Sequence, residues 1–110
     1  MAMYIIQGNF TLDAMRGLMA KPSDRAAAVK HLVEGAGGKM LSYYITTGPF
    51  DFQLTVETDD TEGLMAALMV AGAAGGVSNM QTIQAFSSPE FMAAQTRAGK
   101  MAAGYQAPNA

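Results

Sequence analysis

Residues 50–57, FDFQLTVE, alternate strictly between apolar and polar side chains, and this alternation constrains the fold most. Successive side chains of a strand point to opposite faces, so the segment predicts a strand over 50–58 with one apolar face packed on helices. The Gly48-Pro49 turn before it fixes the register, and the register decides which face each residue takes. The apolar face would hold Phe50, Phe52, Leu54 and Val56, and the open face Asp51, Gln53, Thr55 and Glu57.

Three further strands are predicted over 3–10, 39–47 and 77–86, where β-branched and aromatic residues gather between turn signals. One or two helical turns are expected over 12–19. A helix with Ser23 as N-cap should end at Gly37-Gly38, and a helix over about 61–74, capped by Asp59 or Asp60, should end at Gly75-Gly76. Ser87 or Ser88 should cap a last helix with Pro89 at its first position.

This order predicts an α+β fold: a ferredoxin-like βαββαβ sandwich whose antiparallel sheet has the strand order 4-1-3-2, with an extra C-terminal helix. We expect a domain over 1–87, the helix over 88–103 and a flexible tail over 104–110. In this topology the end of the first strand, the start of the 23–36 helix, the Gly48-Pro49 hairpin and the Gly75-Gly76 turn lie at one edge.

Composition excludes several classes of function. The net charge is −2 and Lys and Arg form no cluster, so no nucleic-acid partner is expected. The longest apolar stretch, GLMAALMVAGAAGG, has about 14 residues, too few to cross a membrane. Cysteine is absent, which excludes disulfides and thiolate metal sites, and the N-terminal segment does not read as a secretory signal. We therefore expect a cytoplasmic protein.

Charged residues make up only 15% of the chain, against about a quarter in a typical domain, which indicates that copies of the chain cover part of its surface. The open sheet face is polar but poor in charge, so we expect it to pack against another subunit, around a wet cavity; the alternative is a solvated face. The helix over 61–74 is apolar nearly all round, which indicates burial by the terminal helix of its own chain or of a partner. Besides residues of 51–57, the open face should carry Gln7, Asn9, Ser42, Tyr44 and Gln81 or Gln84.

A series of short motifs over about residues 3–92 resembles the GYD domain family. Phe50 stands where the family usually has Tyr, so a role of that hydroxyl is absent. The resemblance implies a ferredoxin-like fold and homo-oligomerisation, without a settled activity. More distantly the chain resembles dimeric α/β-barrel proteins, which include cofactor-free oxygenases and isomerases; that link is fold analogy. The motifs are Tyr4, Gly8-Asn9-Phe10-Thr11, Arg25-Ala26, Glu34 with Gly37-Gly38-Lys39, Tyr43-Tyr44, Gly48-Pro49-Phe50-Asp51, Gly76-Val77 and Ala85-Phe86.

Asp51 is the first candidate for chemistry, because a carboxylate beside a rigid turn can accept a proton from a ligand. Its structural alternative is a turn aspartate that accepts backbone N–H groups. Arg25 is the second candidate. It lies in the first helical turn, near the hairpin edge, where it can pair with Asp51 or bind an anionic ligand. Its alternative is a side chain whose stem packs on the surface while its charge reaches water.

Asn9, Tyr44 and Gln53 complete the expected ligand site on the open face, with packing as the alternative for Tyr44. Tyr43 should point into the core, and the single His31 should be exposed. One histidine without cysteines or clustered carboxylates makes no metal site. The ten methionines are scattered along apolar segments, which indicates core packing rather than copper binding. The glycine pairs lack the spacing of a phosphate loop, so we expect no metal and no cofactor.

Three hypotheses remain. The first is a homo-oligomeric small-molecule binding protein that uses Asp51, Arg25, Asn9, Tyr44 and Gln53. The second is a cofactor-independent enzyme of the dimeric α/β-barrel type with Asp51 as general base. The third is a self-assembling structural module without a ligand.

Overall fold

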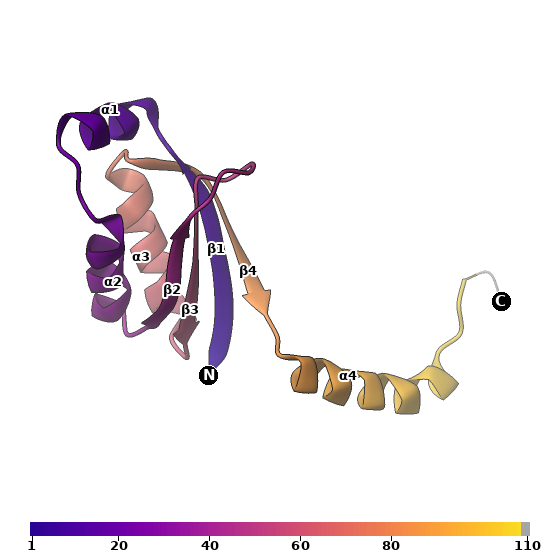
Figure 1. Ribbon diagram of the computed structural model, residues 1–110. Coiled ribbons are helices and arrows are strands. Elements are labelled where there is room, and N and C mark those ends of the chain that lie inside the picture. The colour runs from indigo at the N-terminus through magenta and orange to yellow at the C-terminus, as the bar shows by residue number, and fades with distance from the viewer. Residues whose placement is uncertain (109–110) are drawn as a thin grey trace.

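The computed structural model describes residues 1–108. Its strands are β1 (Ala2–Phe10), β2 (Lys39–Ile45), β3 (Phe52–Thr58) and β4 (Val77–Ala85). They form one antiparallel sheet in the order β2-β3-β1-β4 (Figure 1). Read from the other edge this is the predicted order 4-1-3-2, and the predicted α+β class is confirmed.

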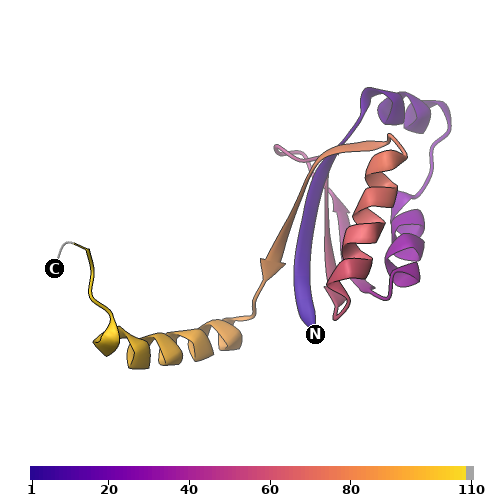
Figure 2. The same cartoon turned by 180° about the vertical axis from the view of Figure 1, so that it is seen from behind.

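Helices cover only one face of the sheet. They are α1 (Leu12–Ala20), α2 (Arg25–Gly35) and α3 (Thr61–Ala73) (Figures 1 and 2). The terminal helix α4 (Ser88–Met101) points away from the other side of the sheet and continues into a short 3₁₀ turn, η1 (Ala102–Gly104). The last two residues of the predicted tail, 109 and 110, lie outside the described residues.

Side-chain caps set the helix starts. Asp24, and not Ser23, caps α2: its Oδ1 accepts from the Ala26 N–H at 3.0 Å, because Asp24 directly precedes the first helical residue. Asp60 caps α3 through the Gly63 N–H at 2.8 Å, and Ser87 caps α4. The φ values of Gly37, +86°, and Gly75, +82°, are left-handed, which explains why helices end there.

Strand β3 begins two residues later than predicted, because the backbone of Phe50 and Asp51 belongs to the turn. From Phe52 onward the alternation is confirmed: Phe52, Leu54 and Val56 are buried on the helix side. Aromatic rings extend this core, with the Phe10 and Phe52 centroids 5.3 Å apart. The other buried apolar residues are Ile6, Val33, Leu64 and Ala67.

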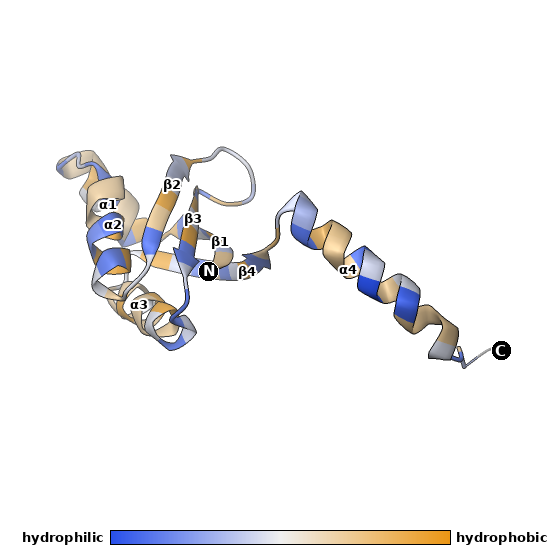
Figure 3. Ribbon diagram, turned by 90° about the horizontal axis from the view of Figure 1, so that it is seen from below, coloured by the Kyte–Doolittle hydropathy of each residue, from blue (hydrophilic) through white to orange (hydrophobic). Residues whose placement is uncertain are grey.

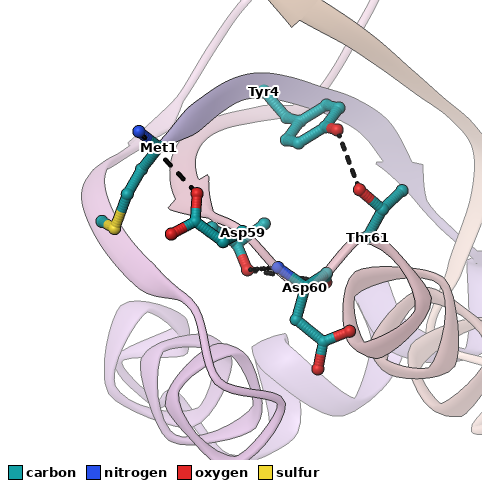
Figure 4. Close-up of polar contacts among 6 residues, drawn as sticks. Met1, Tyr4, Asp59, Asp60 and Thr61 are labelled. Atoms are coloured by element: carbon teal, nitrogen blue, oxygen red, sulfur yellow. Dashed lines mark hydrogen bonds and ion pairs between the residues drawn. The ribbon is translucent and has the colours of Figure 1, made fainter.

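Polar contacts join the start of β1 to the start of α3 (Figure 4). The hydroxyls of Tyr4 and Thr61 share a hydrogen bond of 3.2 Å, and the N-terminal amine lies 3.7 Å from Asp59 Oδ1. The buried Thr58 hydroxyl accepts from the Asp60 N–H at 2.9 Å. These bonds hold the β3–α3 corner against the first strand.

The open face is divided in two by the strand register. A polar row crosses all four strands near the hairpin: Tyr44, Gln53, Gln7 and Gln81 pair in turn. Gln84 pairs with Tyr4, so of the two alternatives for β4 it is Gln81 that lies on the open face. Farther from the hairpin lies an apolar patch that the sequence analysis omitted, formed by Met3, Ile5 and Ile83.

Helix α3 is exposed along one side, where Met65, Met69 and Val70 are 57%, 73% and 58% exposed. Burial of this helix by the terminal helix of its own chain was an incorrect expectation, because α4 points away from the helical layer (Figure 2). Without that contact the molecule is extended. Its Cα radius of gyration is 18.2 Å, against about 13 Å for a compact chain of this length.

Within residues 1–108, no helix has both the length and the apolar character needed to span a lipid bilayer.

Candidate functional site

The strongest candidate site is a cleft at the hairpin edge, on the helix side of the sheet, with a volume of about 600 Å³. We call it the edge cleft. It receives residues from β1, the α1–α2 segment, β2 and the hairpin. Its functional lining includes Arg25, Asp51, Tyr43, Thr46 and Phe10.

Asp51 is half-buried in this cleft and is bound to the end of β1. Its Oδ2 accepts from the Phe10 N–H at 2.9 Å, and its own N–H donates to the Gly8 carbonyl at 2.8 Å. The Thr46 N–H in turn donates to the Asp51 carbonyl at 2.8 Å. The side chain lies in the cleft and not on the open face, because Asp51 precedes β3 and the alternation does not reach it. Asp51 therefore has the structural role of a turn aspartate. Its other carboxylate oxygen, Oδ1, takes no part in the bond to the Phe10 N–H.

Arg25 is the first residue of α2, and its side chain is exposed. Besides the edge cleft it lines a second cleft of about 660 Å³ between α1, α2 and α3, where Leu18 and Val29 form apolar walls. The structure thus brings Arg25 and Asp51 to one cleft. Among residues 1–108, however, neither takes part in an ion pair within 4.0 Å, so the predicted pairing is not formed. The guanidinium remains able to receive an anion.

Tyr43 forms a wall between the core and the edge cleft. Its ring stacks on Phe52 with centroids 6.3 Å apart. Burial raises the pKa of its phenol; the positive charge of Arg25 acts in the opposite direction, and Asp24 adds a smaller rise. The phenol therefore stays neutral at physiological pH and can donate a hydrogen bond. From the sequence, Tyr43 is expected only in the core. The strand register also places it next to Arg25 in the lining of the edge cleft.

Asn9 supports the hairpin. Its Nδ2 donates to the Pro49 carbonyl at 3.1 Å, while its Oδ1 accepts from Asn79 Nδ2 at 3.0 Å. Asn79 sits at an irregularity of β4 and has a positive φ of 52°. Asn9 thus joins the hairpin to the opposite edge strand, and these two bonds use one of its two amide N–H groups and one of its two oxygen lone pairs.

Gln53 and Tyr44 lie on the open face, away from the edge cleft. Gln53 Oε1 accepts from Gln7 Nε2 at 2.9 Å, and Tyr44, which pairs with Gln53, is 64% exposed. The five predicted ligand residues therefore divide between two places. Arg25 and Asp51 share the edge cleft, Asn9 braces its hairpin, and Gln53 and Tyr44 belong to the polar row.

Over the described part of the chain, no three His, Cys, Asp or Glu side chains gather as a metal site would require. His31 is exposed on α2, as expected. The chemistry that the edge cleft offers is one cation, Arg25, two carboxylates, those of Asp24 and Asp51, a neutral phenol and apolar walls.

A family model for the GYD domain matches residues 4–94. The chain belongs to the GYD domain family. The resemblance seen in the sequence motifs is thereby confirmed, and the match includes the edge cleft and all of the sheet except the first two residues of β1. It ends within α4. No curated protein matches this GYD protein significantly.

Solved structures are similar in fold. A transcriptional regulator from Neisseria meningitidis, NMB0573, solved as a complex with L-Met, aligns with a TM-score of 0.55 and 20% identity over 79% of this chain and 51% of that chain. The protein TTHA0845 from Thermus thermophilus aligns with a TM-score of 0.51 and 19% identity over 80% of this chain and 96% of that chain. The GYD protein thus spans about half of the regulator. At these identities the likeness concerns the fold alone.

Proposed function

We propose that this GYD protein is a homo-oligomeric small-molecule binding protein of ferredoxin-like architecture, with its ligand in the edge cleft. The observation that supports this best is the position of Arg25. It stands at the N-terminal end of α2, lines both clefts, and has no ion-pair partner in the described residues. An arginine at a helix N-terminus is suited to binding an anionic group.

The ligand class follows from the walls. Phe10, Tyr43 and Leu18 offer apolar surface next to the guanidinium, and the Tyr43 phenol supplies a neutral donor. This arrangement suits a small carboxylic acid with an apolar body. The regulator solved with L-Met, a ligand of this chemistry, offers a parallel from a similar fold, and this parallel is analogy only.

Binding is favoured over catalysis by the hydrogen bonds of Asp51. One carboxylate oxygen holds the Phe10 N–H, and the backbone of the same residue closes the hairpin. A general base needs its lone pair directed at a substrate proton, whereas this carboxylate already has a structural task.

Homo-oligomerisation is supported by the apolar patch of Met3, Ile5 and Ile83 on the open face. Met3 is 36% and Ile83 52% exposed, and the neighbouring Phe86 is 63% exposed. An uncovered apolar patch on a sheet is stabilised by packing on a second layer, here the open face of another copy.

Native mass spectrometry of protein purified from its source tests the proposal, since it gives the subunit number and any retained small molecule. We expect an oligomer with a defined additional mass. Arg25→Gln should lose that mass, while Arg16→Gln, an exposed arginine on α1, should keep it. A monomer would contradict the homo-oligomer, and equal retention by both variants would contradict the role of Arg25.

A further inference from the structure

Helix α4 is a well-formed helix that covers nothing in its own chain. Every residue of α4 is exposed, and Phe91, Met92 and Met101 are 64%, 65% and 68% exposed. An isolated helix of 12–15 residues is only marginally stable in water, and most helices depend on packing of an apolar face. The helix therefore needs a surface to cover.

The sequence of α4 strongly favours the helix. Ser87 and Glu90 form a reciprocal capping box with hydrogen bonds of 3.2 and 2.8 Å, and Lys100 lies in the last turn. The bonds from Ser87 lower the pKa of the Glu90 carboxyl, so the box persists at neutral pH. A disordered tail would not require a capping box or a basic residue in a last helical turn.

One side of α4 is apolar. Steps of three and four residues place Phe91, Ala94, Ala98 and Met101 along a single stripe, which we call the α4 stripe. The α4 ribbon carries both hydrophobic and hydrophilic segments along its length (Figure 3). Met92 and Lys100 fall on the opposite side, and Ala93 lies about 100° around the helix from Ala94. A stripe with this spacing is typical of a helix that packs on another helix.

The same chain exposes an apolar surface on α3. Met65 and Met69 lie four residues apart on one side of the helix, and Val70 lies about 100° farther around it, so these three exposed side chains border a broad surface; we call them the α3 ridge. Beside the ridge, a groove of about 730 Å³ runs between α2 and α3, with Gly35, Gly63 and Ala66 in its lining. These small residues allow a second helix to approach closely.

We propose that α4 of one copy packs on the α3 ridge of a second copy, and that the second copy returns the same contact. This inference rests on the proposed homo-oligomer. The α3 ridge of the same chain lies in the helical layer on the far side of the sheet, and only a short connection joins β4 to α4 (Figures 1 and 2). Another copy presents the same ridge without that constraint.

The charges and the lengths of the two surfaces agree with α4 of another copy as the helix that covers the α3 ridge. Glu62 is the only charged residue of α3, whereas Arg97 and Lys100 lie in the second half of α4. An antiparallel arrangement brings Arg97, which lies beside the stripe, near Glu62 and opposes the helix dipoles, whereas Lys100 stays on the outer side of α4. At about 1.5 Å per residue, the stripe is roughly 15 Å long and the ridge roughly 8 Å, so the ridge fits within the length of the stripe.

The buried area is sufficient for a specific contact. Phe91 and Met101 of the α4 stripe meet the three large side chains of the α3 ridge in each of two symmetric contacts. At roughly 100 Å² for each large side chain, the two contacts bury on the order of 1,000 Å², the lower limit of specific interfaces.

The family match ends at residue 94, so the second half of α4 extends beyond the GYD domain itself.

The absence of cysteine makes a direct test possible. Two full-length single-cysteine variants, Met69→Cys and Ala94→Cys, are mixed under exchange conditions and oxidised; a disulfide between them can form only between copies. The control replaces Ala94→Cys with Ala93→Cys, which turns the thiol about 100° around α4 and away from the middle of the stripe. Mass spectrometry separates the mixed product from the two homodimeric ones.

We expect the Met69–Ala94 cross-link to exceed the Met69–Ala93 cross-link at least tenfold. Equal yields in a sample that is oligomeric by native mass spectrometry would overturn this contact alone. A predominant Ala94–Ala94 product would also overturn it, because α4 would then pair with its own copy. A monomer would overturn both this contact and the proposed homo-oligomer.

Discussion

At the scale of single residues, Asp51 combines a candidate role with a structural one. Its carboxylate accepts the Phe10 N–H at 2.9 Å, and hydrogen bonds to charged groups contribute about 1.5–3 kcal/mol. Since the residue is half-buried, we expect Asp51→Ala to lower the free energy of unfolding by about 1–2 kcal/mol. Asp51→Asn keeps an acceptor oxygen and should cost less than half of that. Urea denaturation of the two variants measures the difference, and equal losses would show that the charge matters rather than the acceptor.

The sequence predicted part of the candidate site. Arg25 and Asp51 were expected at one edge, because topology brings a helix start and a hairpin together, and they do share a cleft. Tyr44 and Gln53 were assigned to the same site and lie on the other face. The error comes from Asp51, whose backbone belongs to the turn and so escapes the alternation that places Gln53. Turn geometry of this kind produces no periodic pattern in the sequence, so the alternation of the strand does not predict where the Asp51 side chain points.

At the scale of elements, alanine substitutions at two glycines of α3 should change the free energy of unfolding in opposite directions. A Cβ on Gly63 would lie 2.5 Å from the Ala36 carbonyl oxygen at the end of α2. A Cβ on Gly72 would have only the Met80 methyl, at 3.7 Å, as its nearest contact. We expect Gly63→Ala to destabilise by about 1–3 kcal/mol through the forced separation of α2 and α3. Gly72→Ala should stabilise by about 0.5–1 kcal/mol, because alanine is the better helix former.

Chemical denaturation of both variants tests this contrast, with each serving as the control of the other. If Gly63→Ala leaves the free energy of unfolding unchanged, the end of α2 can move aside without loss of stability.

The caps of these helices show which details the sequence alone leaves open. Ser23 and Asp24 are both good caps, and only the exact start of α2 selects Asp24.

At the scale of the whole molecule, the sheet order was predictable because short, right-handed connections leave few topologies. The direction of α4 was not, because its capping box and its apolar residues favour a helix without specifying the surface that this helix covers. The low charge content pointed to assembly, and the exposed apolar patch, the α3 ridge and the α4 stripe show where that low charge is concentrated.

The proposed association through the open face leads to the last prediction. Ile83 lies in the apolar patch, and in a two-fold interface it occurs twice, so Ile83→Glu introduces two carboxylates into one apolar contact. We expect the subunit dissociation constant to rise at least tenfold, about 1.4 kcal/mol. Because assembly stabilises the folded chain by mass action, the wild-type melting temperature should increase with protein concentration, and this dependence should weaken in the variant.

Gln84→Glu is the matched control for this variant. Gln84 is the next residue of β4, but it pairs with Tyr4 on the helix side of the sheet, so the same carboxylate enters the opposite face. Melting curves over a hundredfold range of concentration, together with sedimentation, compare the three proteins. If Ile83→Glu and Gln84→Glu weaken assembly equally, the open face is not the interface. If only Ile83→Glu does so, the apolar patch joins the subunits, and the α3 ridge remains accessible on the outer side of the assembly for α4.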